Sequence, residues 1–99
     1  MKKVVLLCAA GMSTSLLVQK MQAAADEQGF ACAIEAHPVA QAAQAGADAD
    51  IILLGPQVRF QLDRVKEQVS CPVEPIDMRA YGQMNGAAVV AFAKEIIGE

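Results

Sequence analysis

The sequence predicts an α/β fold, with a single open sheet of four parallel strands and helices on both of its faces. Short apolar runs alternate with amphipathic stretches along the whole chain, and this alternation is typical of parallel strands joined by right-handed helical crossovers. The chain has 99 residues, of which 55% are hydrophobic, enough apolar surface for one compact core but hardly for two. We therefore expect one domain spanning residues 1–99.

Four segments are predicted to be strands. Residues 3–8 and 50–54 are mostly apolar, which is typical of strands that are buried on both faces. Residues 31–36 and 73–76 are less apolar. Pro75 lacks a backbone N–H and therefore indicates that the fourth strand lies at an edge of the sheet. We place the first and third strands in the centre, which gives the strand order 2-1-3-4.

A helix is predicted after each strand, from the helical spacing of the apolar residues. The first helix should end near Gly29, a short alanine-rich helix should occupy residues 39–45, and Asn85 can cap the last helix. The residues expected to face the sheet are Leu16, Leu17, Met21, Ala24 and Ala25 in the first helix, Val58, Leu62, Val65 and Val69 in the third, and Val89, Val90, Ala93, Ile96 and Ile97 in the last.

Composition and charge exclude several classes of protein. The net charge is −3, the basic residues are scattered and there is no Trp, whereas a small nucleic-acid binder shows a basic stripe or interleaved aromatic residues. The apolar run over residues 4–10 is far shorter than the roughly 20 residues of a membrane-spanning helix, and no signal-peptide cleavage site follows it. We expect a cytoplasmic protein that neither binds nucleic acid nor inserts into a membrane.

The strand order locates a candidate site. In such sheets, ligands bind beyond the carboxyl ends of the strands, where the crossovers diverge to opposite faces, and Cys8 ends the first of the two central strands. The loop after Cys8 enters a helix, whose unpaired N–H groups and positive dipole end would face a group carried by the sulfur and favour the thiolate. Gly11 permits the necessary turn, and Ser13, Thr14 and Ser15 add hydroxyl donors. The spacing alone leaves open a purely structural cysteine before an ordinary capped helix.

The loop resembles that of the low-molecular-weight cysteine phosphatases, Cys-x5-Arg-Ser/Thr, with one departure. Thr14 stands where the phosphatases have arginine, which clamps the oxygens of the transferring phosphoryl group. Without that guanidinium, hydrolysis should be slow. A cysteinyl phosphate that survives in water suits a relay rather than a phosphatase.

The whole stretch from Leu7 to Val18 is a more specific family signature than the spacing of the cysteine loop alone. It reads Leu-Cys-Ala-Ala-Gly-Met-Ser-Thr-Ser-Leu-Leu-Val. It resembles the active-site loop of the IIB components of the bacterial sugar phosphotransferase system (PTS), in the lactose/chitobiose (cellobiose) class. The likeness extends in order through residues 34–36, 50–57, 72–77 and 81–82, and so covers essentially the whole chain.

The resemblance implies a mechanism, partners and site residues. A phosphohistidine on a phosphorylated IIA protein would donate its phosphoryl group to Cys8, the catalytic residue, which would pass it to a sugar held by a membrane IIC permease. At family level that sugar is a β-linked disaccharide, and neither a metal nor a cofactor is required. The loop that would bind the phosphoryl group consists of Ala9, Ala10, Gly11, Met12, Ser13, Thr14 and Ser15.

Two other functions stay open beside this one. A cysteine phosphatase or arsenate-reductase-like enzyme would turn its phosphoenzyme over quickly, and Thr14 in place of arginine argues against it. A non-catalytic binding or regulatory module with the same fold would take up no phosphoryl group at all.

Several further residues were considered for the site. Cys32 and Cys71 fall at the amino ends of strands, so we expect small buried thiols rather than a redox pair or a metal site. His37 is the only histidine; it is either a phosphoryl acceptor or proton donor, or a solvated turn residue. Gln57, Asp77 and Tyr81 either line the rim of the site or serve as ordinary loop and cap residues. An apolar collar for docking partners is hypothesised from Met12, Val58 and Met84.

Overall fold

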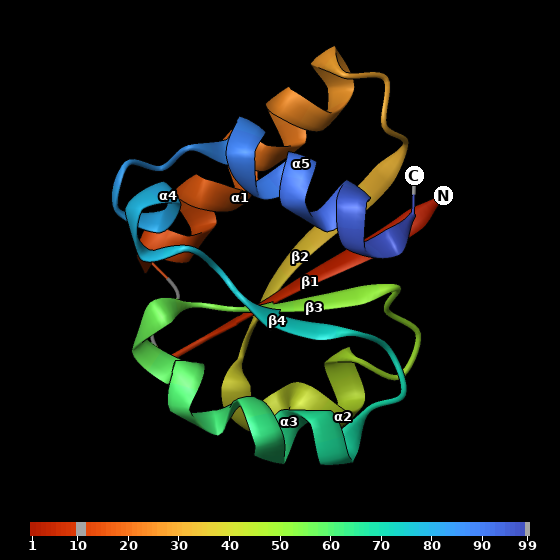
Figure 1. The fold of residues 1–99 in the computed structure, drawn as a ribbon, viewed down its shortest axis with the longest axis vertical. Helices are drawn as coiled ribbons and strands as arrows, with labels where there is room; N and C mark the ends of the chain where they lie inside the picture. The colour runs from red at the N-terminus through yellow and green to blue at the C-terminus, as the bar shows by residue number, and fades with distance from the viewer. Residues whose placement is uncertain (10–11, 99) are drawn as a thin grey trace.

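A computed structural model of the chain describes residues 1–9 and 12–98, with the backbone alone for residues 12 and 13. Its sheet has four parallel strands in the order β2-β1-β3-β4, which confirms the predicted order (Figure 1). The strands are β1 (Lys2–Cys8), β2 (Cys32–Pro38), β3 (Ile51–Leu54) and β4 (Val73–Pro75). Pro75 lies in an edge strand, where the missing N–H removes no hydrogen bond from the interior of the sheet.

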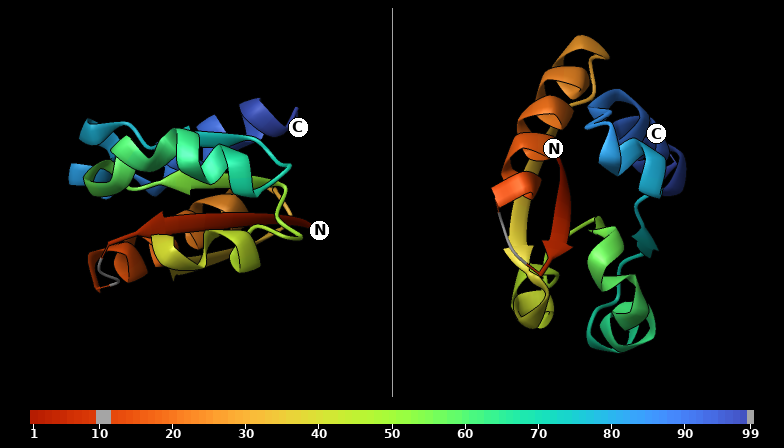
Figure 2. Two further views of the ribbon diagram at one scale, coloured as in Figure 1. Left: turned by 90° about the horizontal axis from the view of Figure 1, so that it is seen from below. Right: turned by 90° about the vertical axis from the view of Figure 1, so that its left-hand side faces the viewer.

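Helices cover both faces of the sheet, as predicted. Figures 1 and 2 show α1 (Met12–Glu27) and α5 (Gly86–Ile97) over one face, and α2 (Ala42–Ala45) and α3 (Leu62–Gln68) over the other. Short 3-10 segments at Val39–Gln41 and Pro56–Gln61 precede α2 and α3, so each of these α-helices begins later than the apolar spacing indicates.

Each face of the sheet has its own hydrophobic core, because successive residues of a strand point to opposite sides. Val4 and Leu6 pack under α1 and α5, whereas Val5 and Leu7 pack under α2 and α3. All four residues of β3 are fully buried. A strand in this position must be apolar throughout, which is why β1 and β3 are the most apolar runs of the sequence.

The first helix differs from prediction at one residue. Leu17 is fully buried, but Leu16 is 46% exposed. Leu17, Met21, Ala24 and Ala25 follow the spacing of one helical stripe, and Leu16 stands about 100° away from Leu17 around the helix axis, toward solvent. The helix ends at Glu27, close to the predicted stop at Gly29, which has a φ of +69°.

A short helix, α4 (Met78–Gly82), was not expected from the sequence. The Asp77 carboxylate caps it by accepting a hydrogen bond from the backbone N–H of Ala80 at 3.0 Å. The signal was available, because an Asp just after a strand is a common N-cap. The predicted cap of α5 is confirmed, since Asn85 Oδ1 accepts from the Ala88 N–H at 3.1 Å.

Gly86 allows α5 to pack closely on α1. A Cβ atom at this position would lie 2.4 Å from the backbone carbon of Lys20, which is closer than atoms can approach. The two helices therefore meet almost backbone to backbone, and this contact fixes α1 over the sheet.

Candidate functional site

Cys8 is the last residue of β1, at the carboxyl edge of the sheet, and its side chain is buried. The backbone N–H of Gly55, just after β3, donates to Leu7 O at 2.9 Å. A Cβ on Gly55 would lie 3.7 Å from the Cys8 Cβ. Gly55 therefore leaves room beside Cys8 that a larger side chain would occupy. The sequence analysis did not place Gly55 at the site, although a Gly-Pro pair ending a strand next to Cys8 was a signal for it.

A small hollow opens beside Cys8. It has a volume of about 100 Å³ and is lined by Cys8, Ala9, Ser15, Ala36, His37 and Pro38. One water molecule needs roughly 10–15 Å³ of such space, so the hollow can hold water or a small polar group. Of the predicted loop residues, Ala9 and Ser15 lie at this hollow.

The N-terminus of α1 lies four residues after Cys8 in the chain. The helix begins at Met12 and has no acidic residue in its first turn, so no carboxylate of that turn opposes an anion at the helix N-terminus. Backbone N–H groups of the first turn have no acceptor within the helix, and the helix dipole favours negative charge there. Ala10 and Gly11, and the side chains of Met12 and Ser13, lie outside the described part of the chain.

Thr14 lies differently from the prediction that its hydroxyl faces the site. Its side chain is buried, and Thr14 Oγ1 lies 3.3 Å from the Tyr81 hydroxyl oxygen. Tyr81 is itself buried, in α4. The structure therefore joins two residues that the sequence analysis treated separately, and it turns the Thr14 hydroxyl toward α4.

Of the residues considered for the rim, Asp77 has the ordinary cap role described above. Gln57 lies next to the site, because its Oε1 would be 3.1 Å from a Cβ on Gly55. Val58 is buried in the core under α2 and α3, so it cannot belong to an exposed apolar collar. Met84 is partly buried against the core under α1 and α5. Among the side chains that the structure describes, Leu16, Phe60 and Met78 are large, apolar and exposed, and each follows the carboxyl end of a strand in the chain.

His37 is a strand residue rather than the solvated turn residue considered above. It is paired in register with Leu7 and lies in β2, and its Nε2 is 2.9 Å from Glu35 Oε1. Leu7 points into the core under α2 and α3. Paired residues of neighbouring parallel strands point to the same face of the sheet. The His37 ring therefore belongs to that face, whereas Cys8, one residue beyond Leu7, is directed to the opposite one.

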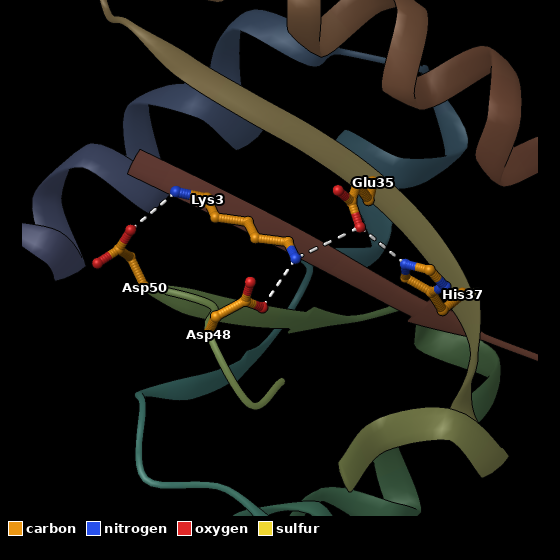
Figure 3. A network of polar contacts seen from close by, with 5 residues as sticks. All are labelled: Lys3, Glu35, His37, Asp48 and Asp50. Atoms are coloured by element: carbon orange, nitrogen blue, oxygen red, sulfur yellow. Dashed lines mark hydrogen bonds and ion pairs between the residues drawn. The ribbon is translucent and has the colours of Figure 1, made fainter. Parts of the chain in front are cut away.

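His37 ends a chain of ion pairs along this face (Figure 3). Lys3 Nζ lies 2.8 Å from Asp48 Oδ1 and 3.7 Å from Glu35 Oε1. The hydrogen bond with His37, and then the nearby Lys3 charge, hold the pKa of Glu35 below its ordinary value of 4.5. The hydrogen bond from Lys3 likewise lowers the pKa of Asp48 from 3.8. These pairs join the amino-terminal half of the sheet to the loop before β3.

Replacing Lys3 with Met is expected to change how stability depends on pH. Carboxyl groups whose pKa is lowered by folding stabilise the folded state above their unfolded pKa, and this contribution is lost as the pH falls through the folded pKa. The melting temperature of the wild type should therefore exceed that of Lys3→Met between about pH 5 and 8, and the difference should shrink toward about pH 3. Thermal unfolding followed by circular dichroism across this range measures it. A difference that is independent of pH would contradict the ion-pair explanation.

The other cysteines lie away from Cys8, as expected. Cys32 pairs with Lys2 at the amino end of β1, while Cys8 pairs with Pro38 at the other end. Burial raises the pKa of both Cys32 and Cys71, which keeps them as thiols.

Among the described residues, no group of His, Cys, Asp and Glu side chains is arranged to hold a metal ion. The same residues contain no helix of the length and apolarity needed to span a membrane.

Known proteins show the same sequence pattern. A family model described as "PTS system, Lactose/Cellobiose specific IIB subunit" matches residues 3–92. The PTS system galactose-specific EIIB component of Lactococcus lactis subsp. cremoris is 41% identical over 104 residues, which cover 97% of this chain and 96% of that protein. The PTS system oligo-beta-mannoside-specific EIIB component of Bacillus subtilis is 43% identical over 89 residues, with coverage of 87% and 86%.

A solved structure shows the same fold. The cellobiose-specific phosphotransferase IIB component protein from Borrelia burgdorferi matches with a TM-score of 0.80 and 34% identity, covering 98% of this chain and 92% of that one. The family match over most of the chain and the relatives matched over nearly their whole length agree with each other, and Cys8 lies beside a small hollow at the end of β1. The chain therefore belongs to the lactose/cellobiose-specific IIB family, the phosphotransferase components of the PTS that take part in sugar transport.

Proposed function

We propose that the chain is a phosphocysteine carrier, which accepts a phosphoryl group from a phosphohistidine on a IIA protein and passes it to a sugar bound by a membrane IIC partner. One observation carries the proposal: Cys8 ends a central strand beside a small hollow, four residues before the first residue of a 16-residue helix. In this proposal the phosphoryl oxygens are bound by backbone N–H groups of the loop and first helical turn, which are those of Ala9, Ala10, Gly11, Met12, Ser13, Thr14 and Ser15.

The chemistry consists of two displacements at phosphorus. In the first, the Cys8 thiolate attacks, an S–P bond forms, and the N–P bond of the donor breaks. The imidazole leaves with the electron pair and takes up a proton. In the second, a sugar hydroxyl oxygen attacks, an O–P bond forms, and Cys8 leaves as thiolate while the hydroxyl proton passes to a base or to water. Each step moves one phosphoryl group between two nucleophiles, so positioning and fixed dipoles around its oxygens do most of the catalysis.

One residue of the cysteine loop distinguishes this chain from a cysteine phosphatase. Arginine in a phosphatase loop would stabilise the charge that develops when water attacks, and Thr14 stands in its place with its hydroxyl turned toward Tyr81. The phosphocysteine should therefore survive long enough to reach the second partner. In keeping with relatives named for cellobiose and oligo-beta-mannoside, the proposed sugar is a β-linked disaccharide, and the carrier works on the cytoplasmic side of the membrane.

Intact-mass spectrometry after incubation with a phosphorylated IIA donor tests the proposal. We expect one added phosphoryl group that persists for many minutes after the donor is removed. Its transfer to a disaccharide should then require membranes that contain the IIC partner. Rapid release of inorganic phosphate would show a phosphatase instead, and no labelling by any phosphorylated donor would show a non-catalytic module.

Replacing His37 with Gln should leave phosphoryl uptake by Cys8 nearly unchanged. His37 is one of the residues that line the hollow beside Cys8. Its ring nitrogen is nevertheless engaged by Glu35 on the other face of the sheet, and Gln can still donate to that carboxylate. The uptake rate, measured by intact mass with a fixed donor concentration, should match that of the wild type. A complete loss would show that His37 carries or relays the phosphoryl group.

A further inference from the structure

The buried contact between Thr14 and Tyr81 links the candidate site to a distant part of the chain. The two residues are 67 positions apart, and their hydroxyl oxygens lie 3.3 Å from each other in the interior. Thr14 is 1% exposed and Tyr81 is 8% exposed. A hydroxyl that is removed from water must form a hydrogen bond or lower the stability of the fold. This contact therefore constrains both helices to which the residues belong.

The Thr14 side of the contact is the first turn of α1. Thr14 is the third residue of that helix and the sixth after Cys8. The backbone N–H groups of a first helical turn have no acceptor within the helix, so they are available to an anion at that end. A small rotation of the turn would redirect them, so whatever holds Thr14 also sets their direction.

The Tyr81 side of the contact is α4, which is anchored at both ends. Ile76, just before it, donates its backbone N–H to Leu54 O at 2.8 Å, and Asn85, just after it, donates to Ala80 O at 2.9 Å. One flank of the helix is nevertheless hollow. A groove of about 360 Å³ runs between β4, α4 and α5, and is lined by Pro75, Ile76, Asp77, Ala80, Ala88, Val89 and Phe92. Packing covers only part of the surface of α4, and the tyrosine hydroxyl adds a directional contact with α1.

We propose that Tyr81 is a positioning residue for phosphoryl transfer: it holds the first turn of α1 through Thr14, so that the N–H groups of this turn face the phosphoryl group on Cys8. The inference rests on the proposed function. It gives Thr14 a role different from that of the phosphatase arginine, because its hydroxyl orders the helix terminus instead of binding the phosphoryl group. In this inference Tyr81 acts on the phosphoryl group through Thr14.

Four variants test the inference: Tyr81→Phe, Thr14→Val, the double variant, and Thr14→Ser as the conservative control. The measurement is the rate of phosphoryl uptake at increasing concentrations of phosphorylated donor, by quenched intact mass. We expect the maximal rate to fall roughly tenfold in each single variant, inside the ~100-fold that a displacement of about 1 Å can cost. The donor concentration at half-maximal rate should not change. The double variant should be no slower than either single variant, and Thr14→Ser should be close to the wild type.

Thermal unfolding of each variant separates positioning from loss of fold. If either single variant does not fold, the other carries the same test, because each removes one partner of the same contact. Wild-type rates in folded Tyr81→Phe or Thr14→Val would overturn the inference. So would additive losses in the double variant, or a Thr14→Ser variant as slow as Thr14→Val. A wild type that takes up no phosphoryl group would instead refute the proposed function, and this inference with it.

Discussion

Replacing Cys8 with Ser is expected to abolish phosphoryl uptake. Serine has nearly the same shape, but its hydroxyl is not ionised near neutral pH, whereas the thiolate is the nucleophilic form of cysteine. Cys8 ends β1 at the hollow beside the N-terminus of α1, so a serine there would keep the surroundings and lose the attacking group. Intact mass after incubation with phosphorylated donor should show no added phosphoryl group, while circular dichroism should show that the variant is folded.

Cys71→Ser provides a matched control for this result. Cys71 is a half-buried thiol that precedes β4 at the amino end of that strand, far from the edge at which Cys8 lies. Burial raises the pKa of its thiol, which disfavours a thiolate there. Uptake by Cys71→Ser should equal that of the wild type. Labelling that persists in Cys8→Ser but disappears in Cys71→Ser would show that Cys71 carries the phosphoryl group, and it would refute the proposal.

Replacing Leu53 with Ala is expected to cause a large loss of stability. Leu53 lies in the middle of β3, is fully buried, and packs in the core under α1 and α5. Such a truncation removes apolar contacts and leaves a cavity, which typically costs about 2–5 kcal/mol. That is a large share of the roughly 5–15 kcal/mol that stabilises a domain. Unfolding in urea, followed by circular dichroism, measures the free energy of unfolding.

Leu16→Ala makes the same chemical change at a position where the structure predicts little effect. Leu16 belongs to α1 but is 46% exposed, and surface substitutions usually change stability by no more than about 0.5 kcal/mol. Alanine also has the higher helix propensity. Equal losses for Leu53→Ala and Leu16→Ala would contradict the placement of Leu16 at the surface.

Much of the fold and the position of Cys8 follow from local features of the sequence. The apolar runs of β1 and β3 indicate strands that are covered on both faces, and Pro75 indicates an edge strand. Together these features give the order of the strands. The order then places Cys8 at the edge where ligands bind, because in a parallel sheet all carboxyl ends meet at one edge.

The contacts that refine the site could not be obtained in this way. Hydrophobic spacing assigns a residue to a helix, but Leu16 and Leu17 differ in burial because of the direction in which α1 meets the sheet. The proximity of Gly55 to Cys8 depends on the register of β1 and β3. The pairing of His37 with Glu35 depends on which face of β2 is turned toward α2 and α3. The hydroxyl contact between Thr14 and Tyr81 joins residues from two distant segments. The chemistry of a side chain and the spacing of apolar residues are local properties of the sequence. The approach of distant groups depends instead on how the helices pack on the twisted sheet, so these contacts are visible only in the folded chain.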